Sequence, residues 1–79
     1  MGGAQLNRIE VVDMTQTLGM RIRQLRMENG YTQVRLATQL GLTKQAVSKW
    51  ENDLAYPDIL LLPALARLLD TTVDEMLTF

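Results

Sequence analysis

Apolar residues recur at helical spacing along most of the chain, in short segments separated by turn-forming residues. Leu18, Ile22 and Leu25 stand at i, i+4 and i+7, which places them on one face of an α-helix. Thr17 precedes this stripe as a helix-capping residue, and Gly30 suits the left-handed conformation that follows a helix end. The pattern predicts a first helix that begins near Thr17 and ends just before Gly30.

The same signals predict two further helices. Thr32 and Thr43 are their expected N-terminal caps, and Gly41 separates the two segments. The second helix has a buried face at Leu36 and Leu40. On the third helix, the residues expected to be buried are Ala46, Val47 and Trp50.

The C-terminal part of the chain contains two more predicted helices. Pro57 biases the residue before it away from helical geometry, so "LAYPD" is expected to be a loop. A fourth helix covers roughly residues 60–69, with Pro63 in its first turn, where a missing backbone N–H is tolerated. Thr72 and Glu75 have the spacing of a capping box for a last helix. No strand–turn–strand pattern interrupts the series, so the predicted fold class is all-α, a compact five-helix domain.

Residues 1–13 stand apart from the helical series, and we predict a flexible leader there and one folded domain at 14–79. The leader is expected to have no role, the alternative being an arm that stabilises a dimer or touches DNA. The N-terminus lacks the layout of a secretory signal, and the longest apolar run, "ILLLPALA", is too short to span a bilayer. We therefore expect a cytoplasmic protein that does not bind a membrane.

Composition removes most catalytic and metal chemistry. The 79 residues include no cysteine and no histidine, which excludes disulfides, thiolate metal sites and the commonest acid–base catalyst. The chain has no glycine-rich phosphate loop, and so small a domain offers little pocket in which a serine, threonine or lysine could be activated. We expect no enzyme activity, no metal and no cofactor.

Charge is distributed unevenly, although the net charge is only −1. Residues 14–49 contain six basic residues and one acidic residue, whereas residues 50–79 contain one basic and six acidic residues. Such a split gives a small protein one positive and one negative side. The basic half of the chain indicates a nucleic-acid partner, although the net charge alone does not indicate one.

The third predicted helix, within "TKQAVSKWEN", has a polar face opposite its apolar one. At about 100° per residue its long polar side chains cluster within an arc of roughly 140°. They are Lys44, Gln45, Ser48 and Lys49. A short helix, a Gly-containing turn and a second short helix lie between Gln33 and Asn52. This is the layout of a helix-turn-helix, whose second helix enters the major groove of DNA.

Residues 18–77 resemble the phage-repressor/Cro-type (xenobiotic-response-element-type) helix-turn-helix family. The matching motifs are "LR" at 25–26, "GYTQ" at 30–33, "LA" at 36–37, "GLTKQAVSKWEN" at 41–52, "YPD" at 56–58 and "VDEML" at 73–77. The resemblance implies a sequence-specific DNA-binding transcriptional regulator, most simply a repressor that occludes a promoter.

The resemblance also implies which residues contact DNA. Gln33 and Thr43 match positions that contact phosphates, and Arg35 is expected to do so because the loop "NDLAYPD" lacks the basic residues often found there in the family. Gln45 can form two hydrogen bonds with adenine, and lysine can donate to guanine or to phosphate. The positions that match base-edge or flanking phosphate contacts are Lys44, Gln45, Ser48 and Lys49.

Arg26 and Glu51 match a structural ion pair of the family, which joins the first helix to the end of the recognition helix.

The family also implies double-stranded DNA as partner and a homodimer, because two recognition helices read half-sites about one helical turn apart. Met76, Leu77 and Phe79 form the apolar edge expected to join the protomers, unless they only complete the monomer core. No sensor domain is present, so we expect no small-molecule effector.

Two alternatives remain open. The first is an antitoxin or a restriction-system controller, which share this domain and which the sequence does not separate from a repressor. The second is a protein-interaction adaptor that does not read DNA, against which the basic half and the polar helix face argue.

Overall fold

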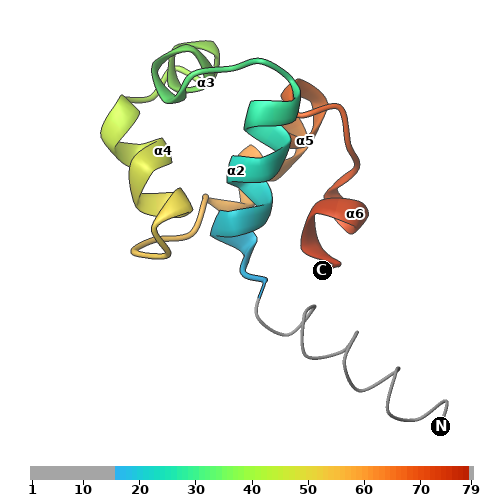
Figure 1. Ribbon diagram of the computed structural model, residues 1–79. Coiled ribbons are helices and arrows are strands. Elements are labelled where there is room, and N and C mark those ends of the chain that lie inside the picture. The colour runs from blue at the N-terminus through green and yellow to red at the C-terminus, as the bar shows by residue number, and fades with distance from the viewer. Residues whose placement is uncertain (1–15, 79) are drawn as a thin grey trace, which may run out of the picture.

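The computed structural model describes residues 16–78 (Figure 1). This part of the chain forms five α-helices and one 3-10 turn and contains no strand, so the all-α prediction is confirmed. No helix in it is long and apolar enough to cross a membrane. The predicted leader at 1–13 lies outside the described residues. The elements are α2 (Leu18–Glu28), α3 (Gln33–Gln39), α4 (Lys44–Glu51), η1 (Ile59–Leu61), α5 (Leu62–Leu68) and α6 (Val73–Leu77).

Threonine side chains cap three of the helices as predicted. Thr17 and Thr32 accept hydrogen bonds from backbone N–H groups in the first turns of α2 and α3, at 3.1 and 3.0 Å. Thr72 accepts from the backbone N–H of Glu75 at 3.0 Å, but its hydroxyl also donates to the Glu75 carboxylate at 3.2 Å. The Glu75 side chain therefore bonds the Thr72 hydroxyl, and only the threonine half of the predicted capping box is present.

Left-handed residues end four of the helices. Gly30 and Gly41 follow α2 and α3 with φ of 76° and 70°, the conformation predicted for them. Asp53 and Asp70 adopt the same conformation after α4 and α5, with φ of 59° and 55°. Aspartate tolerates this region better than most residues, and the sequence analysis did not identify either position as a helix end.

The core draws on all five α-helices. In Figure 1, α2 lies at the centre, α3 and α4 lie on one side of it, and α5 and α6 lie on the other. α2 contacts both α4 and α6, and α3 contacts α4. Burying each large apolar side chain contributes about 1.5–3 kcal/mol. The largest fully buried side chains are Ile22, Leu36, Val47, Leu65, Leu69 and Met76.

The predicted C-terminal dimer edge is wrong at Met76. This side chain is completely buried because α6 packs against α2 and α5, which turns it toward the core. Leu77 is 46% exposed, and Phe79 lies outside the described residues. A continuous apolar edge at Met76 and Leu77 is therefore not present.

The fourth predicted helix begins with a tighter turn than expected. The carboxylate of Asp58 accepts a hydrogen bond from the Leu60 N–H at 2.8 Å, and residues 59–61 form the 3-10 turn η1. The α-helix begins only at Leu62, with Pro63 in its first turn as predicted. The chain therefore presents η1 as a separate feature beside α4.

Gly19 allows α2 to approach α4 closely. A Cβ atom at this position would lie 2.1 Å from the carbonyl oxygen of Trp50 and 2.6 Å from a carboxylate oxygen of Asp53. Neither distance is possible for a real side chain. The absence of a side chain at Gly19 therefore helps to determine how the C-terminal end of α4 sits against α2.

Candidate nucleic-acid interface

α4 presents one anchored face and one open face. Val47 and Trp50 are buried against the core, as predicted, and Ala46 is partly buried. On the other face Lys44, Gln45 and Lys49 are exposed, and Ser48 is partly buried. The structure brings the four polar side chains together around one open hollow of about 260 Å³, lined by Lys44, Gln45, Ser48 and Lys49.

Positive charge on this face is not neutralised locally. Within residues 16–78 the one ion pair joins Arg26 to Glu51, so neither Lys44 nor Lys49 is matched by a carboxylate there. Both ammonium groups therefore remain available to an anion. No group of His, Cys, Asp or Glu in the described part of the chain is arranged to hold a metal ion.

Thr43 stands at the N-cap of α4 without capping it. Its backbone has the N-cap conformation, with φ −93° and ψ 156°, but its side chain makes no capping hydrogen bond. The N–H of Ala46 donates instead to the Thr43 carbonyl oxygen at 3.1 Å. Thr43 thus differs from the threonines before α2, α3 and α6, and its exposed hydroxyl is free for an external partner.

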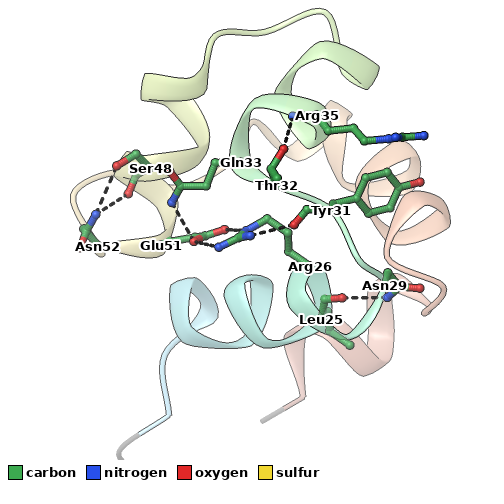
Figure 2. A network of polar contacts seen from close by, with 10 residues as sticks. All are labelled: Leu25, Arg26, Asn29, Tyr31, Thr32, Gln33, Arg35, Ser48, Glu51 and Asn52. Carbon is green, nitrogen blue, oxygen red and sulfur yellow. Dashed lines mark hydrogen bonds and ion pairs between the residues drawn. The ribbon is translucent and has the colours of Figure 1, made fainter.

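A largely buried polar network connects α4 to α2 and α3 (Figure 2). Arg26 on α2 donates from Nε and Nη2 to the two carboxylate oxygens of Glu51, at 2.6 and 3.0 Å. Its Nη1 donates to the backbone carbonyl of Tyr31 at 2.8 Å. The two side chains are only 12% and 3% exposed. This bidentate contact between Arg26 and Glu51 restricts the orientation of α4 relative to α2.

Gln33 joins the same network. Its side-chain amide donates to Glu51 Oε1 at 3.0 Å. A glutamine amide has two N–H groups, so one remains after this contact. The structure therefore places Gln33 at the start of α3 and links it to the end of α4, with one side-chain donor not used by this contact.

Arg35 lies apart from the other predicted DNA contacts. Its guanidinium carbon lies 6.0 Å from the centre of the Tyr31 ring, within the range of a cation–π contact. Figure 2 shows its side chain directed away from Ser48 and the α4 face. The structure does not bring Arg35 together with the α4 residues, and its exposed side chain extends over the Tyr31 ring instead.

Asn52 was not singled out from the sequence, yet it contacts the open face. Its side-chain amide donates to the Ser48 carbonyl at 2.8 Å and approaches the Ser48 hydroxyl oxygen at 3.4 Å. The hydroxyl hydrogen of Ser48 remains free to donate. The i, i+4 spacing of Ser48 and Asn52 was the available signal.

The chain resembles known proteins over most of its length. A family profile described as helix-turn-helix matches residues 22–76. The chain is 36% identical over 58 residues to the HTH-type transcriptional activator BcrR of Enterococcus faecalis. It is 37% identical over 59 residues to YonR of Bacillus subtilis strain 168, an HTH-type transcriptional regulator derived from the SPbeta prophage. These matches cover 73% and 75% of this chain but 28% and 55% of the two relatives.

Solved structures share the fold. The P22 c2 repressor in complex with a synthetic operator is 33% identical, with a TM-score of 0.74, and the match covers 80% of this chain and 96% of that one. The restriction–modification controller protein C.AhdI of Aeromonas hydrophila is 30% identical, with a TM-score of 0.68, and the match covers 75% and 89% of the two chains.

Proposed function

Because the chain belongs to the helix-turn-helix family, we propose that it is a sequence-specific DNA-binding transcriptional regulator that reads the major groove with α4. The open face of α4 carries this proposal, since Lys44, Gln45, Ser48 and Lys49 gather around one hollow while the opposite face is anchored in the core. An α-helix fits the major groove, and lysine, glutamine and serine provide the donors and acceptors that base edges match.

The roles of the residues follow from their chemistry. Gln45 can pair with an adenine edge through its amide, and Lys44 and Lys49 can donate to guanine or to phosphate. The free hydroxyl of Thr43 stands at the N-terminus of α4, whose unpaired N–H groups favour a phosphate. Gln33 adds its remaining amide donor from the start of α3. Phosphate contacts position the protein, and base contacts determine which sequence it prefers.

Repression through a homodimer is the mode of action that we propose. A single α4 reaches only a few base pairs, so a second copy on an adjacent half-site increases both affinity and specificity. A protein bound in this way excludes other proteins from the same DNA without any catalytic step. The likeness to the P22 c2 repressor bound to an operator supports this mode. A regulator of this kind acts where the genome is, which fits the cytoplasmic location expected from the sequence.

A restriction-system controller is the second candidate, favoured by the likeness to C.AhdI. It uses the same DNA-reading face and differs in the genes it controls. The gene next to the coding sequence distinguishes the two, because a controller lies beside an endonuclease or a methyltransferase gene.

Selection from random double-stranded DNA tests the proposed function. The purified protein is incubated with a random library, and the bound fragments are sequenced over several rounds. We expect an enriched motif, with two related half-sites about one helical turn apart. Enrichment should disappear in a variant with Gln45→Ala and Lys49→Ala, whereas Gln39→Ala, an exposed change at the end of α3, should leave the motif unchanged. Absence of any motif would instead support the adaptor alternative.

A further inference from the structure

A second open hollow, of about 450 Å³, lies between α4 and η1. It shares no lining residue with the hollow at the polar face of α4. Its lining is almost entirely apolar and includes the single tryptophan of the chain. The lining residues are Leu42, Ala46, Trp50, Asp58, Leu60 and Leu61. We call this hollow the η1 hollow.

Asp58 brings a carboxylate to the η1 hollow. One of its oxygens accepts the hydrogen bond from the Leu60 N–H at 2.8 Å, which begins η1. Within residues 16–78 the other oxygen accepts no hydrogen bond, and no cation pairs with the carboxylate. The hollow therefore combines an apolar surface with a negative charge that no residue in the described part of the chain neutralises.

We propose that the η1 hollow binds a small apolar cation, such as an amine that carries an aromatic ring or an aliphatic chain. Ligand sites are clefts of about 300–1,000 Å³ with mostly apolar linings and a few polar groups that orient the ligand. The η1 hollow meets both conditions. The apolar body of the ligand lies against the leucines and Trp50, and its ammonium group faces Asp58.

The charge and size of the hollow favour this class of ligand over the alternatives. A carboxylate in the lining repels anions, which disfavours nucleic acid and organic acids. A neutral ligand would displace water from the carboxylate without offering it a partner of opposite charge. A protein partner needs about 800 Å² on each side of a stable interface, which is far more than the lining of one hollow exposes.

Leu42 and Ala46 place the η1 hollow next to the polar face of α4. They flank residues 43–45, which belong to the proposed DNA-reading face. Ligand binding does not itself depend on that function, because no lining residue is among the proposed DNA contacts. The sequence analysis led us to expect no small-molecule effector, since it considered a separate sensor domain and not a site within the helical domain. The proposal can therefore be tested without DNA.

A nuclear magnetic resonance titration of the full chain with 4-phenylbutylamine tests the proposal. At neutral pH this probe carries one ammonium group on an apolar body. Its controls are 4-phenylbutanol, which is neutral, and 4-phenylbutyrate, which is an anion. We expect the amine to shift the backbone resonances of Ala46 and Leu60 and the indole N–H resonance of Trp50. Because an exposed charge pair contributes modestly, the amine should bind about threefold more tightly than the alcohol and on the order of tenfold more tightly than the acid.

Two matched pairs of variants distinguish this site from unspecific binding. Asp58→Asn keeps an oxygen for the Leu60 N–H and removes the charge, so the amine should lose its advantage over the alcohol. Asp53→Asn removes the same charge from a residue that does not line the hollow, and the advantage should remain. Leu60→Lys should weaken amine binding about tenfold through charge repulsion. Ile59→Lys, which is exposed on the same turn but outside the lining, should have little effect.

Equal affinity for the three probes, or equal effects within either pair of variants, would overturn the proposal. If the same resonances shift when the free protein is diluted, a second copy of the chain covers the hollow, which would also overturn it. A protein that binds the amine but selects no DNA motif would remove the proposed function alone. One that selects a motif but does not bind the amine would remove the η1 ligand site alone.

Discussion

Gln33 at the start of α3 donates its side-chain amide to Glu51 Oε1 at the end of α4, the same oxygen that accepts from Arg26 Nη2, and both distances are 3.0 Å. This shared oxygen links α3 and α4, the two helices of the helix-turn-helix, to α2. Because Glu51 is only 3% exposed, little water competes for it. The carboxylate therefore adds a polar constraint to the apolar contacts that already join α3 and α4.

Glu51→Ala should destabilise the protein strongly. The change leaves the Arg26 guanidinium without its carboxylate in a largely buried site, and removal of one partner from a buried pair costs about 3–5 kcal/mol. Since Arg26 is 12% exposed and can gain some solvent, we expect about 3 kcal/mol, near the lower end of that range. Urea unfolding measures the difference. Glu28→Ala on the exposed end of α2 is the control and should change the free energy of unfolding by less than about 0.5 kcal/mol. A similar change in both variants would show that the Arg26–Glu51 pair is solvated.

Gln33→Ala should affect stability modestly and DNA binding uniformly. Loss of one hydrogen bond to Glu51 costs about 1 kcal/mol, while Arg26 still satisfies the carboxylate. If the remaining amide donor contacts phosphate, affinity should fall equally for preferred and unrelated DNA. The salt dependence should not change, because glutamine carries no charge that would release a counterion. Fluorescence anisotropy at several salt concentrations measures both quantities, and loss confined to the preferred site would mean that Gln33 reads a base.

Gln45→Ala should reduce discrimination between DNA sequences. The amide of an exposed residue on α4 is expected to contribute about 1–3 kcal/mol of preference for one base. Affinity for the selected site should fall by that amount, whereas affinity for unrelated DNA should stay nearly constant. The melting temperature should not change, since Gln45 lies opposite the Val47–Trp50 face. Gln39→Ala serves as the matched control, and an equal effect of the two variants would indicate that the α4 face is ordinary surface.

Lys49→Ala distinguishes a phosphate contact from a base contact. If the ammonium group binds phosphate, affinity should fall for all sequences, and the slope of log affinity against log salt should become shallower by about one unit. If it binds guanine, the loss should concentrate on the selected site. Arg67→Ala, an exposed change in the last turn of α5, removes the same charge from a residue outside the α4 face. Identical behaviour of these two variants would contradict a DNA contact by Lys49.

Gly19→Ala should destabilise the protein despite the better helix propensity of alanine. In an open helix the change stabilises by about 1 kcal/mol. Here the new methyl group would lie 2.1 Å from the Trp50 carbonyl oxygen, so α2 and α4 must separate. We expect a net loss of about 1–3 kcal/mol from overpacking, measured by thermal unfolding. A gain in stability would show that the two helices do not approach as closely as described.

Several local features were predicted correctly because neighbouring residues determine them. The threonine caps at Thr17 and Thr32 and the left-handed glycines at Gly30 and Gly41 each depend on the backbone within one turn. The gathering of Lys44, Gln45, Ser48 and Lys49 on one face follows from helix geometry alone, because at about 100° per residue the four positions fall within an arc of roughly 140°. These features define the candidate interface.

Tertiary packing decided the features that the sequence left open or misjudged. Met76 and Leu60 are both apolar and near helix ends, yet one is completely buried and the other is 88% exposed. The hydrogen bond from Gln33 to Glu51 spans 18 residues, and the close approach at Gly19 joins segments about 30 positions apart. Periodicity shows which residues share a face of one helix, but it carries no information about which face meets which neighbour. That choice depends on how five helices fill one core without voids or clashes. It determined both the polar contacts that orient α4 and the exposure of the apolar side chains of η1.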